Sequence, residues 1–342
     1  MIYLDSAAMT RPLECALEAY RAAPFGNPSS EHAVGSAARD ALEQARAKIA
    51  QLMDCEPDEL YFTATATEAA ATAINSLEYD DIHVVPTTVE HHSVSENCTR
   101  FSGTEIAFAS MLAQNETGEK FRPPERTKNE YWVCDATAAV GHIPVSFRDL
   151  GCDYLLADSI KFGGVPGAAF LIAKKNAPLY PLIRGGGQER GMRSGTENVP
   201  AICAMAAALE WQTEHMEENT RHISVLAGLM VGLLSEIPHI KWNTPFGGVP
   251  RLPHIINISF DGVDAHTLAL LLSNDGVMVS PGAACSNGLH EPSHVIMAMF
   301  NDEARARSAI RISLSHENTP EECRIAAEKI AECVKHLREL GG

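Results

Sequence analysis

Residues 155–170, LLADSIKFGGVPGAAF, place a single lysine between an apolar run of strand length and a glycine-rich turn. The lysine is Lys161, and a lysine just past a strand is most often a solvated loop residue. A chemical role requires other polar groups at the same edge of the sheet. The elements around this stretch therefore decide how Lys161 is interpreted.

Short apolar runs alternate with helix-like segments on both sides of Lys161. The segment 31–53 keeps Val34, Leu42 and Ile49 on one face, which indicates a long amphipathic helix. The alternation predicts an α/β fold with a mainly parallel sheet covered by helices on both faces. Six apolar runs have strand length, at residues 59–64, 81–88, 105–110, 130–136, 153–158 and 168–175.

The order of these elements indicates two domains. Residues 13–225 are expected to form a large α/β domain with a sheet of the seven-stranded type. Residues 1–12 and 226–342 are expected to form a smaller α+β domain that ends in a helix from Pro320. A long helical stretch after Asn198 joins the two domains.

The charge of the chain limits its partners. It carries 44 acidic and 27 basic residues, for a formal net charge of -17, which repels a phosphate backbone or an anionic membrane. The start, MIYLDSAAMT, lacks the basic and apolar regions of a signal peptide, and no apolar run approaches the ~20 residues of a membrane span. We expect a cytoplasmic protein with no direct nucleic-acid or membrane partner.

The nine cysteines do not predict disulfides or a metal site. Their number is odd and no CxxC pair occurs, so neither a disulfide framework nor a zinc site is expected. Cys285 differs from the others because it lies in SPGAACSNGLHEPS, residues 280–293, a loop of mostly small residues with little to bury it. It is a candidate reactive thiol.

Three polar segments follow predicted strands, at the sheet edge where ligands of parallel sheets gather. Thr65 to Thr67, with Ala66 between them, lie at a predicted helix N-terminus, which suits a phosphate or an ordinary helix cap. Asp135 ends a strand, where its carboxylate needs a cation such as a pyridinium, or forms a structural turn. His91 and His92 could stack on a flat cofactor or move a proton, although a surface histidine is commoner.

Together these residues resemble a pyridoxal phosphate site, and further motifs resemble one family along the whole chain. The order of the motifs is that of the cysteine desulfurases of the class V aminotransferase fold, in the group with a long, mobile cysteine loop. The two most specific motifs are RGGGQERGMRSGTENVP and ACSNGLHEPSHV. The others are IYLDSAAMT, FGNPSSEHAVG, FTATATEA, VEHHSV, QNETG, CDATAAVG, SIKFGG and AIRISL.

The resemblance implies a transferase of pyridoxal phosphate fold type I and gives roles to residues of the larger domain. Lys161 would form the Schiff base with the cofactor, and Asp135 would keep the ring nitrogen protonated. His91 would stack on the ring. Thr67, Ala66 and Ser159 would bind the phosphate. Thr196 would complete the phosphate site of a neighbouring subunit, so a homodimer is implied.

The resemblance also implies how the substrate is held and cleaved. Arg311 would bind the carboxylate of L-cysteine in a bidentate fork, and Asn115 would approach the ring oxygen or the substrate. Cys285 would attack the substrate sulfur, release L-alanine and keep the sulfur as a persulfide. His91 or His290 could lower the pKa of this thiol. The persulfide would pass to an acceptor such as an iron–sulfur cluster scaffold or a tRNA-thiolation protein.

Four positions differ from the family pattern. Asp158 and Ile160 replace a usual serine and histidine before the lysine, Ala138 replaces a glutamine, and Thr65 replaces a glycine. A carboxylate beside the phosphate would repel it unless the side chain turns away, in which case Ser159 could substitute. Two other functions stay open, a related pyridoxal phosphate enzyme such as a selenocysteine lyase, and a weakly catalytic scaffold homologue.

Overall fold

The structure is a computed structural model that describes residues 1–341 except 101, 104, 128 and 283–290. The chain divides into two compact units. The larger unit comprises Arg11–Leu112 and Arg122–His215, and the smaller unit comprises Met1–Thr10, Ala113–Phe121 and Met216–Gly342. Among the described helices, none combines the length and the apolar character that a membrane crossing requires.

Three stretches belong to a different unit from the one expected: residues 113–121 and 216–225 were expected in the large domain, and residues 11–12 in the small one. Residues 113–121 fall within the expected large domain, yet they are part of the smaller unit. Backbone pairing explains this, because Lys120 N donates to Pro250 O at 2.9 Å and Leu252 N donates to Gly118 O at 2.7 Å. The segment therefore extends the smaller unit.

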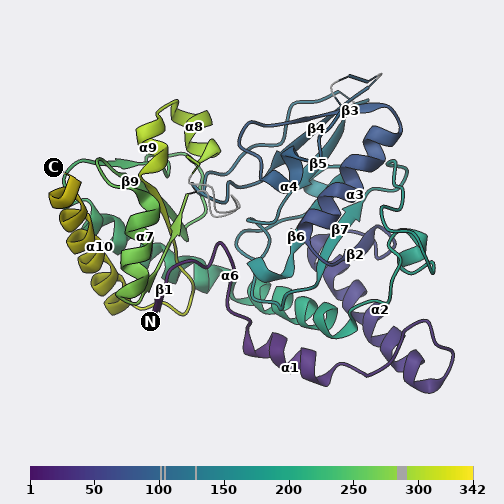
Figure 1. The fold of residues 1–342 in the computed structure, drawn as a ribbon. Helices are drawn as coiled ribbons and strands as arrows, with labels where there is room; N and C mark the ends of the chain where they lie inside the picture. Colours follow the sequence, from purple (N-terminus) through teal and green to yellow (C-terminus); the bar gives the residue numbers. More distant parts are fainter. Residues whose placement is uncertain (101, 104, 128, 283–290, 342) are drawn as a thin grey trace. The chain divides into compact units, whose positions relative to one another are not determined.

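The larger unit is built on a mixed sheet with the strand order β2-β7-β6-β5-β4-β3 (Figure 1). The four strands from β3 to β6 are mutually parallel, whereas β7 runs antiparallel to both of its neighbours. The described sheet thus has six strands rather than seven, and all six predicted runs form strands. Their bounds are β2 Leu60–Thr63, β3 Ile82–Pro86, β4 Glu105–Met111, β5 Tyr131–Asp135, β6 Tyr154–Asp158 and β7 Ala169–Ala173.

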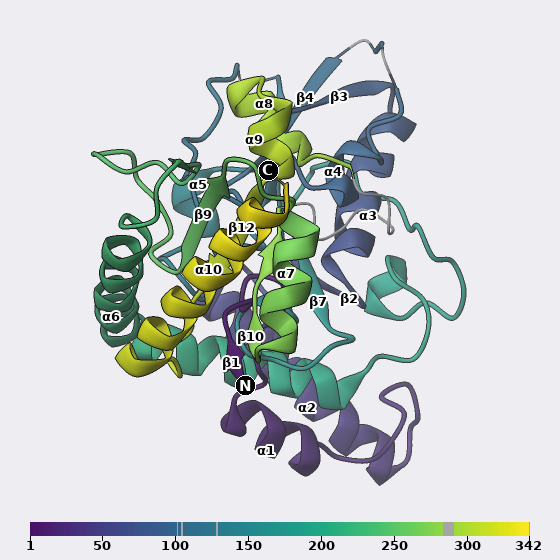
Figure 2. The same ribbon diagram turned by 60° about the vertical axis from the view of Figure 1, so that its left-hand side comes forward.

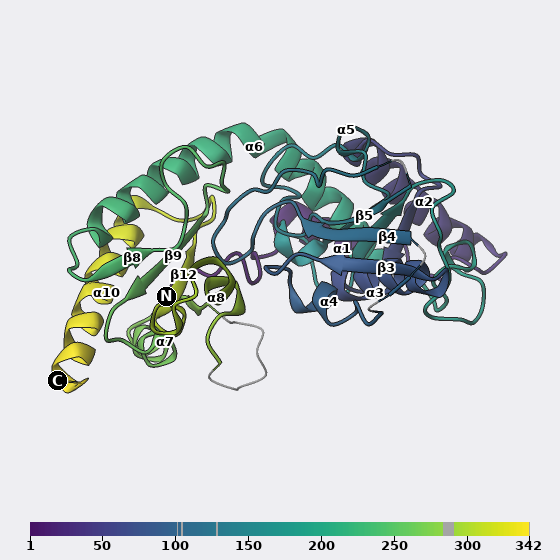
Figure 3. The same cartoon turned by 90° about the horizontal axis from the view of Figure 1, so that it is seen from above.

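Helices cover both faces of this sheet. Figure 3 shows α3 and α4 on one face and the first part of α6 on the other. The buried face of α3 consists mainly of alanines, which lets its backbone lie close to strands β3, β6 and β7. The helices are α1 Glu14–Ala22, α2 Ala33–Met53, α3 Ala66–Tyr79, α4 His92–Ser95, α5 Phe147–Leu150 and α6 Val199–Leu234, with the 3-10 turns η1 Ser159–Lys161 and η2 Glu189–Gly191.

A buried ion pair joins three parts of the larger unit. Arg46 on α2 contacts Glu189 on η2 through two nitrogens, at 2.9 and 2.6 Å, and both side chains are almost fully buried. Glu189 also accepts a hydrogen bond from Phe62 N of β2 at 2.8 Å, and Arg46 donates to Leu60 O at 2.9 Å. The pair therefore connects α2, β2 and the segment 184–200.

The smaller unit contains an antiparallel sheet with the order β11-β12-β9-β8 and a separate parallel pair, β1-β10. Figure 2 shows α7 and α10 side by side against this sheet, and they bury one apolar core with the second half of α6. The strands are β1 Ile2–Tyr3, β8 Ile240–Trp242, β9 Ile255–Phe260, β10 Val277–Met278, β11 Ser280–Pro281 and β12 Ala309–Ser313. The helices are α7 Ala265–Asn274, α8 His294–Phe300, α9 Glu303–Arg307 and α10 Pro320–Gly341.

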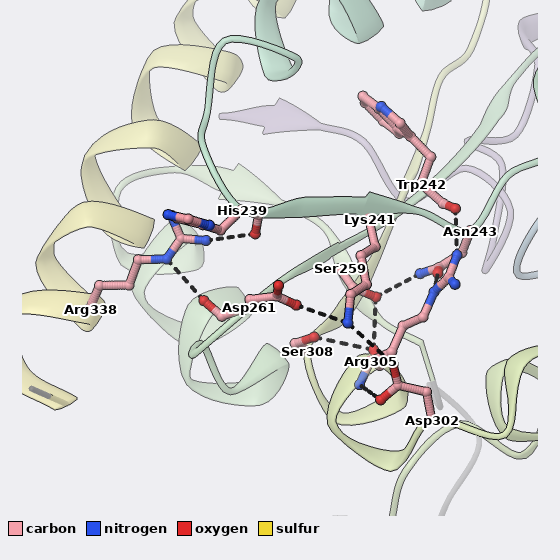
Figure 4. Close-up of polar contacts among 10 residues, drawn as sticks. All are labelled: His239, Lys241, Trp242, Asn243, Ser259, Asp261, Asp302, Arg305, Ser308 and Arg338. Carbon is pink, nitrogen blue, oxygen red and sulfur yellow. Dashed lines mark hydrogen bonds and ion pairs between the residues drawn. The ribbon is translucent and has the colours of Figure 1, made fainter.

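Charged side chains connect the edge strand β8 to neighbouring segments through hydrogen bonds and ion pairs (Figure 4). Arg305 on α9 donates to Trp242 O and to Asn243 Oδ1, each at 2.6 Å. Lys241 lies between Asp261 and Asp302, at 3.4 and 3.2 Å. These contacts occupy polar groups of a short strand that has a neighbour on one side only.

We predict that Glu189→Gln destabilises the larger unit by roughly 3 kcal/mol, because it leaves the buried Arg46 charge without its main partner. Replacing the exposed Glu217, which pairs with Arg221, by Gln should change the free energy of unfolding by less than about 1 kcal/mol. Urea unfolding of both variants compares the two effects. Equal effects would show that the Arg46–Glu189 pair has no special importance.

Candidate active site

The carboxyl ends of the paired strands β5 and β6 bring two aspartates to one edge of the sheet. β5 ends at Asp135 and β6 ends at Asp158, and both side chains are 7% exposed. Lys161 is the last residue of η1, the turn that directly follows β6, and it is half-buried. The fold of the larger unit therefore places the lysine of the opening motif beside two buried carboxylates.

The Asp158 side chain turns toward the start of α3. Its Oδ2 accepts a hydrogen bond from Ala66 N at 2.9 Å, and its Oδ1 accepts one from Ile160 N at 3.3 Å. Burial raises the pKa of the Asp158 carboxyl, with a further rise from the Asp135 charge, while these two hydrogen bonds and Lys161 oppose the shift. Asp158 therefore lies at the helix N-terminus where the sequence predicts a phosphate.

The start of α3 is a reciprocal capping arrangement. Thr65 is the N-cap and its side chain accepts from Glu68 N at 3.2 Å, while Glu68 Oε2 accepts from Ala64 N at 3.0 Å. Arg193 pairs with Glu68 at 2.7 Å. Thr67, in the first turn, is exposed. Its hydroxyl and backbone N–H make no hydrogen bond within the described part of the chain and can serve a bound anion.

The backbone around Lys161 is held from several sides. His142 Nε2 lies 2.9 Å from Lys161 O, and Gln212 donates to Phe162 O at 3.2 Å. Two glycines then make close approach possible. Gly163 has φ +90°, and a Cβ on Gly164 would lie 1.9 Å from Ser159 Oγ. The turn therefore presents the lysine from a fixed backbone.

Asp135 and His91 are each fixed by a local hydrogen bond. Asp135 Oδ1 accepts from Thr137 N at 2.8 Å. His91 Nδ1 accepts from Ser93 N at 3.0 Å and lies 2.7 Å from Ser93 Oγ. Accepting at Nδ1 places the ring proton of a neutral His91 on Nε2. The imidazole plane is thereby oriented without a ligand.

Two buried hydroxyls fit the presence of a polar cofactor. Ser159 Oγ and Thr137 Oγ1 are buried and have no hydrogen-bond partner among the described residues. They flank Lys161 and Asp135 in the sequence. A buried polar atom without a partner is costly, so a ligand with oxygen and nitrogen atoms at this sheet edge would satisfy them.

A second group of site residues lies in the smaller unit. Arg311 on β12 is 3% exposed; it donates to Asn115 O at 2.9 Å and pairs with Asp5 Oδ1 at 2.8 Å. Its Nε is buried and has no hydrogen-bond partner in the described part of the chain. Arg311 thus retains its Nε–H for an anion such as a carboxylate.

Glu116, next to Asn115, is fully buried in the same unit. Ser293 Oγ donates to Glu116 Oε2 at 2.6 Å, and Asn257 donates to Glu116 O at 3.1 Å. Burial raises the pKa of the Glu116 carboxyl to about 7, although Ser293 and the Arg311 charge lower it. This carboxyl therefore titrates near neutral pH.

The predicted site residues fall into two groups, one in each unit. Lys161, Asp135, His91, Thr67, Ala66 and Ser159 belong to the larger unit, and Asn115 and Arg311 belong to the smaller unit. Thr196 is an exposed residue of the larger unit. Cys285 and His290 lie outside the described residues.

The sequence analysis did not select three acids, the half-buried Asp5 and the buried Glu90 and Glu116. Glu90 is 1% exposed, and its Oε1 accepts from Thr87 Oγ1 at 2.6 Å and from Met111 N at 3.0 Å. Burial and the Asp135 charge raise its pKa to about 7. All three acids lie within the quoted motifs. For Glu90 and Glu116, a carboxylate directly beside a residue already assigned to the site, His91 or Asn115, was the available signal.

Comparisons with known proteins identify the family of the chain. The family model described as aminotransferase class-V matches residues 2–121 and 108–325. The chain belongs to the class-V aminotransferase family, whose members are pyridoxal phosphate enzymes. Within that family, its relatives are cysteine desulfurases.

One such relative is a cysteine desulfurase from Enterobacter agglomerans, 35% identical over 380 aligned positions that cover 99% of this chain and 94% of that protein. Another is the cysteine desulfurase IscS of Clostridium botulinum, 30% identical, with 99% and 96% covered. Among solved structures, a NifS-like protein from Rickettsia africae has a TM-score of 0.89 at 28% identity, with 98% and 99% covered.

We predict that Glu116→Gln reduces the loss of stability between pH 5 and pH 8. The folded-state pKa of about 7 exceeds the ordinary value of 4.5, so the wild-type carboxyl favours the unfolded state increasingly as pH rises through this window. The contribution is about 2 kcal/mol. Thermal unfolding at both pH values measures this contribution. If the variant and the wild type lose the same stability between pH 5 and pH 8, the prediction is contradicted.

Proposed function

We propose that this chain is a pyridoxal phosphate-dependent cysteine desulfurase, which converts L-cysteine to L-alanine and keeps the sulfur as an enzyme persulfide. The observation that carries the proposal is the convergence of Lys161, Asp135 and the start of α3 at one edge of the larger sheet. The family supplies the reaction class. The convergence supplies a site of matching chemistry in this chain.

In this proposal, different residues of the larger unit bind different parts of the cofactor. Lys161 Nζ would hold the cofactor through its aldehyde, the buried Asp135 carboxylate would keep the ring nitrogen protonated, and His91 would stack on the ring. Thr67 and Ser159 supply hydroxyls to the phosphate, and Thr67 adds a backbone N–H. When bound, the cofactor supplies an electron sink for bonds at the substrate α-carbon.

The residues of the smaller unit bind the substrate carboxylate. Arg311 already uses one Nη1 proton for Asn115 O and one Nη2 proton for Asp5. Its Nε–H and the remaining Nη2–H lie on one side of the guanidinium and form a fork for a carboxylate. Asp5 holds that fork in a fixed rotation.

Cys285 receives the sulfur. Its thiolate attacks the substrate sulfur, so that an S–S bond forms as the C–S bond breaks. The electron pair stays with carbon, which takes a proton and leaves as the methyl group of L-alanine. The resulting persulfide passes to a sulfur-acceptor protein. We further propose a homodimer, in which Thr196 reaches the phosphate of the partner's site.

We predict that borohydride reduction of the wild-type protein with pyridoxal phosphate leaves a pyridoxyl group on Lys161. Lys161→Ala should retain the fold and lose the label, since no other lysine lies at this sheet edge in the described chain. Peptide mass mapping locates the modified lysine, and Lys174→Ala serves as the matched control. A label on another lysine, or none in the wild type, would overturn the proposed site.

We predict that Cys285→Ser binds pyridoxal phosphate but releases no sulfide from L-cysteine under reducing conditions, because serine cannot accept the sulfur. The measurements are cofactor absorbance and sulfide release, with Cys98→Ser as control for the loss of a thiol. Wild-type rates of sulfide release from the Cys285→Ser protein would favour a mechanism like that of a selenocysteine lyase.

A further inference from the structure

The Asp158 carboxylate accepts a hydrogen bond from a backbone N–H that a phosphate at the start of α3 would also use. In the first turn of α3, Glu68 N is taken by Thr65 Oγ1 and Ala66 N is taken by Asp158 Oδ2. Among the described residues, only Thr67 N of this turn has no acceptor. An anion at the helix start therefore meets a carboxylate already bound there.

The surroundings of Asp158 are rich in buried acids. The Asp135 charge raises the pKa of the buried Glu90 and of Asp158. Strand β7 contributes the uncharged Ala169 opposite Asp158. Within the described residues, the charged groups that act on Asp158 are Lys161 on η1 and Asp135 on β5. Glu68, paired with Arg193, belongs to the same helix start as Ala66.

We propose that Asp158 couples cofactor binding to proton uptake: the cofactor phosphate and the Asp158 carboxylate compete for Ala66 N–H, and the phosphate enters when Asp158 accepts a proton. This inference rests on the proposed pyridoxal phosphate site. The proton comes from solvent and forms an O–H on Asp158. That hydroxyl donates to a phosphate oxygen, so a repulsive pair becomes a hydrogen bond.

The sign of the pH dependence follows from linkage. A group that is protonated in the complex and ionised in the free protein makes binding weaker as pH rises, by about tenfold per pH unit above its pKa in the free protein. Burial raises the pKa of Asp158 above its ordinary value. Cofactor binding is thus tighter at lower pH, and this pH dependence is due to the Asp158 side chain.

Pyridoxine 5′-phosphate is the probe for this test, because it has the ring and phosphate but no aldehyde to react with Lys161. Its Kd is measured from pH 7 to pH 9 with the full chain and with Asp158→Asn, whose side-chain oxygen can still cap Ala66 N–H. We expect the wild-type slope of log Kd against pH to exceed that of Asp158→Asn by about one. At pH 8 the variant should bind more tightly than the wild type.

Glu68→Gln is the matched control, since it removes a carboxylate from the same helix start but not the one on Ala66 N–H. Its slope should equal that of the wild type, whereas a slope like that of Asp158→Asn would overturn the specific role of Asp158. Equal slopes in wild type and Asp158→Asn would overturn it too. If Asp158→Asn does not fold, calorimetry of the wild type at pH 8 in buffers of different ionisation enthalpy decides, with about one proton taken up as support and none as refutation.

The labelling of Lys161 by pyridoxal phosphate and borohydride separates the two proposals. If Lys161 is labelled and no proton uptake is linked to Asp158, only the coupling fails. If Lys161 is not labelled, the cofactor site itself fails.

Discussion

The buried ion pair between Arg46 and Glu189 is the contact on which the larger unit depends most. It connects a long helix, the first strand of the sheet and the glycine-rich segment that starts at Arg184. A charge pair without water is tolerated only when nearly every oxygen and N–H is used, and here backbone groups of β2 complete the set. Part of the most specific motif of the chain is therefore structural: its glutamate binds strand β2, which lies two places from β6 in the sheet.

Negative charge is the second constraint on the site. The larger unit places Glu90, Asp135 and Asp158 near one edge of the sheet, where burial raises the pKa of Glu90 and Asp158. A protonated ring nitrogen would make the total charge of this cluster less negative, and a phosphate would make it more negative. The two ends of one cofactor thus act oppositely on the same cluster.

The sequence was most informative where a pattern has one physical cause. Apolar runs predicted the six strands, because a strand covered on both faces must be apolar throughout, and the predicted helix at 31–53 forms. Val34, assigned to its buried face, is 46% exposed because it lies in the first turn. The direction of the Asp158 side chain and the unit of residues 113–121 depend on hydrogen bonds between distant segments, which no local pattern reveals.

Ser159, Thr137 and Arg311 carry buried polar atoms with no partner among the described residues. Each such atom costs about 1–3 kcal/mol in the empty protein. A ligand that pairs these atoms therefore stabilises the fold in addition to enabling chemistry. In a cell that degrades opened chains, the lifetime of this protein would follow its supply of cofactor and substrate. Abundance would then respond to vitamin nutrition without any change in gene expression.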